Sequence, residues 1–236
     1  MTCPCCPSNI NNLDNFFDAA NARKEAQHYL KKGLDKRARK LIAYLLTHCR
    51  DPISVLDIGC GAGGAHLELL RQGVASHALG VDASSGYLAA AQANAAQLNL
   101  SDRVTYHHHD FAQTAASFAP ADAVLMDRVI CCYPHLAQLL GAAAEHAERY
   151  LCLSFPRDEW WSRPPYRVVD FFQTLFRSKY RFYLHPRSQV VAVAQAGGLR
   201  LIHTDRTFFW QIMVFARPQP FKDRANQHPP SVETPG

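Results

Sequence analysis

The residues of this sequence best suited to chemistry are acidic side chains that follow strand-like runs. Asp57 precedes a cluster of glycines in VLDIGCGAGG, residues 55–64, and Asp82 ends a second run in LGVDASS. Asp110 ends a third run in VTYHHHDF, and Phe111 follows it. A carboxylate at the end of a strand accepts hydrogen bonds from hydroxyl or amino groups, or faces a cation. The spacing therefore predicts one polar ligand site built from several strand ends.

The glycines after the first run predict a sharp turn that lets a ligand approach the backbone. Gly59, Gly61 and Gly64 satisfy the spacing of the dinucleotide-binding fingerprint. A phosphate-binding P-loop is excluded, because no Gly-Lys-Ser/Thr follows the turn. Asp57, two residues before the turn, would repel a pyrophosphate and suits a cationic ligand. An NAD-dependent oxidoreductase stays open as the alternative enzyme class.

The three acids together describe one kind of ligand. Asp82 is placed to accept both hydroxyls of a ribose. Asp110 is able to accept an adenine amino group, beside the ring of Phe111 on which adenine packs. Asp57 adds a preference for positive charge. A ligand with an adenine, a free ribose diol, a positive charge and no phosphates is S-adenosylmethionine.

The elements that must position these residues alternate along the chain. Strand-like runs are expected at 53–58, 77–82, 103–107, 122–126 and 149–154, and helices at 63–72, 85–98 and 134–148. This alternation predicts a parallel sheet with helices on both faces. Two later runs, LRLIHTD and TFFWQIMVFAR, are joined by a very short connection, so we expect them to pair antiparallel.

The segment before the first strand, 14–48, is expected to form two helices separated by Gly33. Apolar residues recur there at helical spacing, which predicts a face turned toward the protein interior. The basic residues of the second helix fall mostly elsewhere on the helical wheel, and we expect them to be solvated; they are Lys36, Arg37, Arg39 and Lys40.

Four motifs, in this order and spacing, carry a resemblance to a known family. VLDIGCGAGG, GVDAS, HHDF and ADAVLMDRVICCYP resemble the successive motifs of class I S-adenosylmethionine-dependent methyltransferases, over about residues 50–155. The resemblance implies a Rossmann-like, doubly wound α/β sheet of seven mostly parallel strands. The last strand would be antiparallel and inserted beside the fifth. It also implies S-adenosyl-L-methionine as the cofactor.

The resemblance assigns roles to individual residues. Asp57 and the turn glycines would hold the methionine portion, Asp82 the ribose, and Asp110 with Phe111 the adenine. The full expected cofactor set is Asp57, Gly59, Cys60, Gly61, Gly63, Asp82, Ala83, Ser84, Asp110, Phe111 and Asp127. Asp127 falls where the family faces its substrate. Candidate general bases in this stretch are Asp127, Tyr133 and His135.

The acceptor of the methyl group is expected to be a small molecule. The insertion at 156–187 is rich in aromatics and arginines, and is expected to contain a helix near 165–177. It either completes the core or covers an acceptor pocket, and both readings stay open. A pocket of this composition favours a flat or apolar acceptor, with a carboxylate on it for the arginines. The candidate acceptor-binding residues are Tyr29, Arg128, Trp160, Trp161, Arg163 and Tyr166.

Other sequence features narrow the acceptor further. The fourth motif reads MDRVICCYP and not Asn/Asp-Pro-Pro-Tyr/Phe, which counts against the amino groups of bases and glutamine. The later segment LSFPR…RF…HP…AGGLR resembles magnesium-protoporphyrin O-methyltransferases faintly. CPCC and CCYP leave a thiol or metalloid acceptor open. A non-catalytic module that only binds S-adenosylmethionine is the alternative outside catalysis.

Composition limits the remaining possibilities. The chain has 236 residues, 48% of them hydrophobic, and a formal charge of +5, which fits one globular domain at 14–217 better than a nucleic-acid binder. Residues 1–13, with CPCC, and 218–236 are expected to be loose ends. We expect no metal centre, including at His107–His109, and mostly reduced cysteines. No apolar run suits membrane insertion or export, so a cytoplasmic location is expected, with a homodimer left open.

Overall fold

Apolar residues buried on both faces form the two central strands of the sheet. β1 spans Ile53–Ile58 and β4 spans Ala121–Asp127, and both are buried along most of their length. Strands covered on both faces are typical of a parallel sheet with helices on each side. These elements come from a computed structural model, which describes residues 19–159 and 182–218 of the chain.

The described strands form one sheet in the order β3-β2-β1-β4-β5-β7-β6. The other strands are β2 (Ala75–Asp82), β3 (Val104–His108), β5 (Ala147–Pro156), β6 (Arg200–Arg206) and β7 (Trp210–Ala216). The first five strands are parallel, and β7 is antiparallel to both β5 and β6. The predicted seven-stranded sheet, with its antiparallel last strand beside the fifth, is confirmed.

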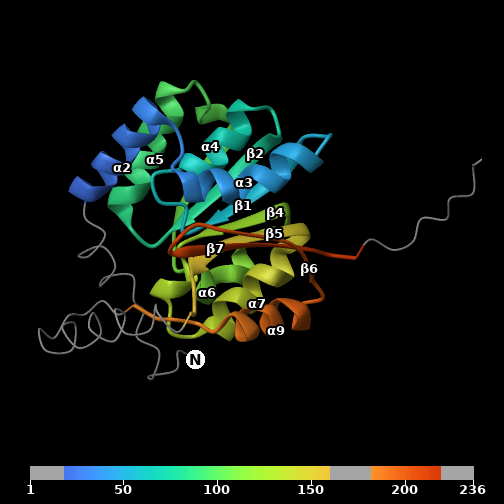
Figure 1. The fold of residues 1–236 in the computed structure, drawn as a ribbon. Helices are drawn as coiled ribbons and strands as arrows, with labels where there is room; N and C mark the ends of the chain where they lie inside the picture. The colour runs from blue at the N-terminus through green and yellow to red at the C-terminus, as the bar shows by residue number, and fades with distance from the viewer. Residues whose placement is uncertain (1–18, 160–181, 219–236) are drawn as a thin grey trace, which may run out of the picture.

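Helices cover both faces of this sheet (Figure 1). The described helices are α2 (Ala19–Lys32), α3 (Lys36–His48), α4 (Gly64–Arg71), α5 (Ser85–Gln97), α6 (Phe111–Thr114), α7 (Leu136–His146) and α9 (Arg187–Ala196). Short 3-10 turns lie at Ser101–Arg103, Ala115–Ser117 and Ile130–Cys132. Figure 1 shows α3, α4 and α5 on one side of the sheet and α6, α7 and α9 on the other, so the described part is a three-layer α/β structure.

Each face of the sheet has its own hydrophobic core. On one face Leu41 and Leu45 of α3 pack with Leu67 of α4 over the central strands. On the other face Leu140 of α7 and Val190 of α9 belong to the second core, and all five side chains are fully buried. Since burial of one such side chain stabilises a fold by about 1.5–3 kcal/mol, these two layers hold the strand ends in place.

The topology brings the functional strand ends to one edge of the sheet. β1 lies between β2 and β4, with Asp57 paired to Gly80 on one side and to Leu125 on the other. The chain therefore leaves β1 and β4 toward opposite faces at neighbouring points, which is the switch point where open α/β sheets bind ligands. Asp82 and Asp127 end the strands on either side of β1.

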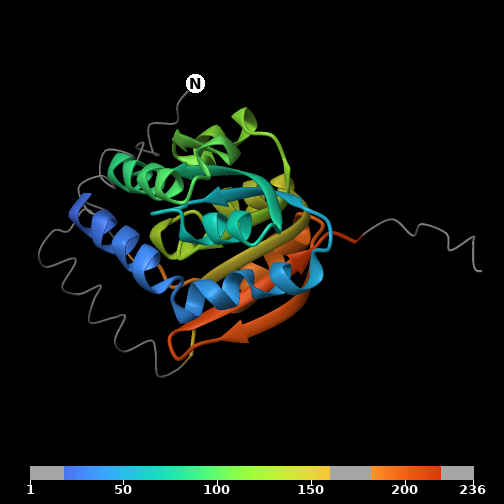
Figure 2. The same cartoon turned by 90° about the horizontal axis from the view of Figure 1, so that it is seen from above.

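The N-terminal helices differ from the sequence expectation at one residue, Arg37. α3 lies in the helical layer with Leu41, Ile42 and Leu45 in the core, as their helical spacing predicts. Arg37, expected in solvent, is only 6% exposed. Helical periodicity assigned it to the polar face, but that face meets the edge of the sheet at the end of β4. Figure 2 shows α2 beside α5, and Figure 1 shows both on the same side of the sheet as α3 and α4.

Element boundaries shift slightly from the predicted ones. The helix expected at 134–148 ends at His146, because Ala147 already pairs with Ala121 as the first residue of β5. The helix expected near 165–177, the CPCC motif and all of the expected tail at 218–236 except Pro218 lie outside the described residues. Within the described segments, no helix is long and apolar enough to cross a bilayer.

Candidate active site

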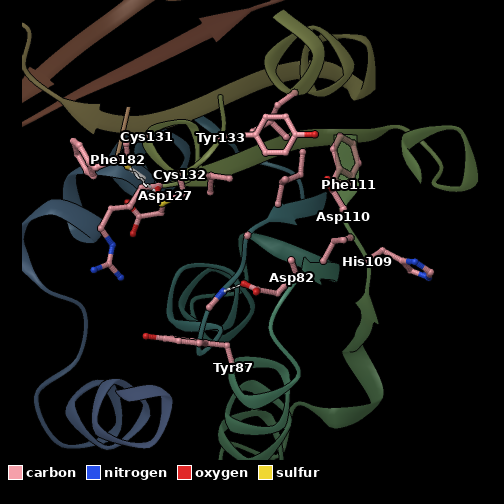
Figure 3. Close-up of a pocket in the computed structure, with 18 of the residues that line it drawn as sticks. Asp82, Tyr87, His109, Asp110, Phe111, Asp127, Cys131, Cys132, Tyr133 and Phe182 are labelled. Atoms are coloured by element: carbon pink, nitrogen blue, oxygen red, sulfur yellow. Dashed lines mark hydrogen bonds between the residues drawn. The ribbon is translucent and has the colours of Figure 1, made fainter. Parts of the chain in front are cut away.

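A cavity of about 300 Å³ opens at the carboxyl ends of the central strands (Figure 3). Asp82 lies near its middle. Asp110 and Phe111 lie on one side of it, and Asp127 and Cys131 lie on the other. This volume is at the lower end of the range of about 300–1,000 Å³ typical of small-molecule sites. The cavity thus joins three of the strand ends that the sequence singled out.

The glycine turn forms the floor of the cavity. Gly59 and Gly61 have φ angles of 63° and 55°, in the left-handed region that glycine adopts without a side-chain clash. The Gly59 amide donates to the carbonyl of Val81 over 2.7 Å, which ties the turn to β2. A methyl group on Gly59 would lie 2.6 Å from Cγ2 of Val129, which also lines the cavity. Glycine is therefore required here for both conformation and space.

Asp82 is held by the backbone of its neighbours. Its Oδ2 accepts from the Gly61 amide and its Oδ1 from the Ser84 amide, both over 2.8 Å. Burial raises the pKa of Asp82 to about 6, although the two amide hydrogen bonds oppose the shift. Asp57 nearby adds to the increase. The two amides thus fix the orientation of the carboxylate. Because the carboxylate is buried, further hydrogen bonds from a ligand that displaces water would stabilise its charge.

Asp110 and Phe111 form the end of the cavity that the sequence assigned to adenine. Asp110 caps α6, accepting from the Ala112 amide over 3.1 Å and from Nε2 of Gln113 over 2.9 Å. Burial raises its pKa. The ring of Phe111 stacks on Phe118 with 5.7 Å between centroids, which leaves the wall flat and apolar. Each Asp110 oxygen retains a lone pair for an incoming donor.

Asp57 lies behind the turn and not among the described residues that line the cavity. Its Oδ2 pairs with Nδ1 of His66 over 2.8 Å, and Nε2 of His66 lies 2.9 Å from the Tyr106 hydroxyl. Burial raises the pKa of Asp57, and the His66 contact opposes that shift. Its Oδ1 has no hydrogen-bond partner among the described residues. The direct contact with a cationic ligand expected from the sequence is replaced by a buried Asp57–His66 pair beneath the turn.

Three more residues of the expected cofactor set support the turn without lining the described cavity. Cys60 is buried, with its Sγ close to Gly80, and burial raises the pKa of its thiol. Gly63 is the N-cap of α4 with a φ of 83°. Ser84 is the N-cap of α5, its hydroxyl accepting from the Tyr87 amide. Ala83 does line the cavity, as expected.

Asp127 lies at the acceptor side and both of its oxygens are engaged. Oδ1 accepts from the hydroxyl of Ser154, and Oδ2 forms an ion pair with Arg37. The Arg37 guanidinium also lies over the ring of Trp210, 5.4 Å from its centroid. Both carboxylate oxygens are thus already engaged by groups of the protein. We therefore assign Asp127 a positioning role in place of the predicted role as general base.

Arg128 follows Asp127 and also lines the cavity. Its φ of 63° is unusual for a residue other than glycine. The guanidinium pairs with Glu25 of α2, with Nη2 2.9 Å from Oε1. Glu25 in turn accepts from the hydroxyl of Tyr87, another lining residue, over 3.4 Å. An N-terminal helix thus reaches the rim of the cavity through one charged side chain.

The remaining candidates separate clearly. Tyr133 lines the cavity, whereas His135 is exposed at the start of α7 and is not among the described lining residues. Tyr29 was expected to bind the acceptor, but it is buried in the core, donates to Oε2 of Glu68 over 3.3 Å and does not line the cavity. The side chains of four further candidates lie outside the described residues: Trp160, Trp161, Arg163 and Tyr166.

Sequence reasoning missed several residues that line the cavity or hold its walls. These are Glu25, Arg37, Tyr87, His109, Phe182 and Trp210. Tyr87 follows the GVDAS motif by three residues, so helical spacing could have found it. The others come from elements distant in sequence, or carry no local signal. Within the described part of the chain, no three His, Cys, Asp or Glu side chains converge to hold a metal.

Comparison with known proteins agrees with this geometry. Residues 55–150 match a family model described as a methyltransferase domain. This part of the chain is therefore a methyltransferase domain. The chain is 45% identical over 58 residues to a release factor glutamine methyltransferase of Caulobacter vibrioides, a match that covers 25% of the chain. That match spans only 20% of the relative's own length.

Solved structures of methyltransferases share the fold of this one. Magnesium protoporphyrin IX methyltransferase from Synechocystis PCC 6803, with bound S-adenosylhomocysteine, superposes with a TM-score of 0.70 at 19% identity, covering 89% of this chain and 100% of the other. A putative sarcosine dimethylglycine methyltransferase from Galdieria sulphuraria gives a TM-score of 0.63 at 12% identity, over 84% and 98% of the two chains. At these identities the likeness concerns the fold.

Proposed function

We propose that this methyltransferase transfers the methyl group of S-adenosylmethionine to a small-molecule acceptor by in-line displacement. The observation that carries the proposal is a single cavity in which one side suits the cofactor and the other side is left for an acceptor. Asp82 and Asp110, at the ends of β2 and β3, face the side suited to ribose and adenine. Asp127, the last residue of β4, and Cys131 line the other side, which is left for an acceptor.

The chemistry at the acceptor side is alignment more than proton transfer. The acceptor's nucleophilic atom attacks the methyl carbon, the carbon–sulfur bond breaks, and S-adenosylhomocysteine leaves. An enzyme accelerates such a step by holding both partners in line and excluding water. Because Asp127 is engaged by Arg37 and Ser154, the one lining candidate left for a base is Tyr133. An acceptor that is already a carboxylate needs no base at neutral pH.

The acceptor wall favours a flat ligand. Phe182 lies beside Cys131 and Asp127 on that side of the cavity (Figure 3), and Trp210, another lining residue, contacts Arg37, the partner of Asp127. Aromatic rings pack well against planar groups. The solved magnesium protoporphyrin IX methyltransferase aligns over its whole chain, and the porphyrin in its name is a planar molecule. A planar carboxylate-bearing acceptor, with magnesium protoporphyrin IX tested first, is therefore the specific proposal.

Acceptors of other classes have less support. The match to a release factor glutamine methyltransferase covers only 20% of that protein's length. The fourth motif of this chain also reads MDRVICCYP. Methylation of the amino groups of bases and glutamine is associated with Asn/Asp-Pro-Pro-Tyr/Phe at this position. A non-catalytic binding module would need no aromatic acceptor wall.

Two measurements test the proposal. Isothermal titration calorimetry with S-adenosylmethionine, S-adenosylhomocysteine and NAD should give binding for the first two and none for NAD. Transfer of a labelled methyl group should then be followed with magnesium protoporphyrin IX and with its dimethyl ester, which lacks free carboxylates. Labelling of the first and not the second supports a carboxylate acceptor. Binding of NAD alone would overturn the assignment.

A further inference from the structure

An ion pair spans the rim of the cavity between segments far apart in the sequence. Nη2 of Arg128, just after β4, lies 2.9 Å from Oε1 of Glu25 on α2. Arg128 lines the cavity, and Glu25 accepts from the hydroxyl of the lining residue Tyr87. A methyl group built on Gly61 would lie 3.8 Å from Glu25 Oε1. The pair therefore stands over the far end of the glycine turn.

A series of contacts connects the adenine end of the cavity to the ion pair between Glu25 and Arg128. Asp110 and Asp82 both line the cavity, and Asp82 Oδ2 accepts from the Gly61 amide over 2.8 Å. Glu25 approaches Gly61 and accepts from the hydroxyl of Tyr87, which also lines the cavity. A ligand whose ribose is bound to Asp82 and whose adenine lies at Asp110 would extend its remaining end along Gly61 toward Glu25 and Arg128.

The ion pair between Arg128 and Glu25 is weak enough for a ligand to replace it. Both side chains are about two-fifths exposed, 41% for Arg128 and 40% for Glu25, and ion pairs at such positions are weak. Burial lowers the pKa of Arg128, but the carboxylates of Glu25, Asp127 and Asp35 raise it, and the net direction is upward. Arg128 thus remains a cation beside other carboxylates when Glu25 turns to a ligand.

We propose that Glu25 and Arg128 bind the amino-acid end of the cofactor, the ammonium on Glu25 and the carboxylate on Arg128. The inference rests on the proposed function and deepens it. The α-amino acid of S-adenosylmethionine carries one positive and one negative group on adjacent atoms, which matches the opposite charges of the pair. Insertion between the two side chains replaces one half-exposed ion pair by two charge-assisted contacts. Arg128, expected from the sequence on the acceptor, is thereby assigned to the cofactor.

The test compares three ligands that differ in their amino-acid end. S-adenosylmethionine and S-adenosylhomocysteine carry the amino acid, whereas 5′-methylthioadenosine has the adenosine and sulfur without it. Calorimetry on the full chain should show that Glu25→Gln and Arg128→Gln each raise the Kd of the first two ligands by about tenfold or more, the effect of losing one charge-assisted contact. The Kd of 5′-methylthioadenosine should stay within about twofold of the wild-type value.

Two further variants separate binding from support of the fold. Glu145→Gln, at an exposed position of α7, is the matched control and should change none of the three Kd values. The double variant Glu25→Arg with Arg128→Glu restores an attractive pair between α2 and the β4 loop but reverses the charges that the amino acid meets. Its melting temperature should stay near that of wild type, while both amino-acid-bearing ligands should bind weakly.

The outcomes divide cleanly. Equal weakening of all three ligands by Glu25→Gln, or wild-type affinity for S-adenosylmethionine in the double variant, would show that the pair only supports the fold. Unchanged affinity in both single variants would also overturn the inference, while leaving the proposed function in place. Failure of the wild-type protein to bind any of the three ligands would instead overturn the proposed function itself.

Discussion

Arg37, in the first turn of α3, forms an ion pair with Asp127 at the end of β4 while its guanidinium lies over the ring of Trp210 on β7. Asp127 and Trp210 both line the cavity, and Arg37 joins them from outside it. One buried side chain therefore connects the N-terminal helical layer to two walls of the acceptor side. The carboxylate of Asp127 is held in place by this contact and by Ser154.

Removing Arg37 should destabilise the protein strongly. The Arg37 side chain is 7% exposed and that of Asp127 is 16% exposed, so Arg37→Met leaves a carboxylate without its cation in a poorly hydrated place. Breaking a buried pair in this way costs about 3–5 kcal/mol, and we expect a loss near the lower value. Denaturant unfolding followed by circular dichroism measures it.

A second pair from the same helix provides the control. Lys40 pairs with Asp205 over 2.5 Å, but the two side chains are 28% and 32% exposed. Lys40→Met should therefore cost no more than about 1 kcal/mol. Equal losses in the two variants would mean that Arg37 contributes no more than a surface ion pair.

Asp82→Ala should weaken binding of S-adenosylmethionine by about 2 kcal/mol or more, because it removes a charge-assisted acceptor from the ribose hydroxyls. Calorimetry measures the change, and thermal unfolding checks that the fold survives. Asp102→Ala, at an exposed position before β3, is the control and should bind normally. A variant at Asp82 with wild-type affinity would remove this residue from the site.

The pH dependence of cofactor affinity should report the same carboxylate. Burial raises the pKa of Asp82 to about 6 in the free protein, and only the ionised form accepts charge-assisted hydrogen bonds from both hydroxyls of a ribose diol. Affinity for S-adenosylmethionine should therefore rise as the pH increases from 5 to 7, and this rise should disappear in Asp82→Asn. Affinity that is flat over this range in the wild-type protein would contradict the assignment.

The stability of the free protein should respond to Asp82 with the opposite sign. Because the pKa of Asp82 in the folded protein lies above its ordinary value of 3.8, protonation of this carboxyl group favours the folded state. Its contribution is fully present below about pH 3.8 and is lost as the pH rises through about 6. The free energy of unfolding of wild type minus that of Asp82→Asn should therefore fall between pH 4 and 7. A difference that stays constant over this range would show that the carboxyl group is not perturbed by folding.

Gly59→Ala should impair both the fold and the cofactor site. The positive φ alone costs an alanine about 1–2 kcal/mol, and its methyl group would also meet Val129 at 2.6 Å. Gly73→Ala is a matched control, with a φ of 73° and open space around the added methyl. Thermal unfolding should show a larger loss at Gly59 than at Gly73, and only Gly59→Ala should weaken cofactor binding.

Much of this protein follows from its sequence because the signals are local. The end of β1 and its glycine turn are encoded within VLDIGCGAGG, where apolar residues give way to positions with positive φ. Alternation of strands and helices predicts the parallel order and the edge at which Asp82 and Asp110 lie. Those two acids could be found without knowledge of the helices that pack around them, since Asp82 ends β2 and Asp110 follows the end of β3 by two residues.

The walls and the partners of the acids were decided by the tertiary structure. Asp57 was expected to face the ligand, but the packing of α4 brings His66 onto its carboxylate. Arg37 and Glu25 lie on polar faces of helices. Helical periodicity does not predict that these two charged side chains will contact residues at the end of β4, which lie 90 and 103 residues away in the sequence. Such contacts depend on how whole helices dock against the sheet, because docking is driven by the apolar faces and the charged side chains then meet whatever lies at the border.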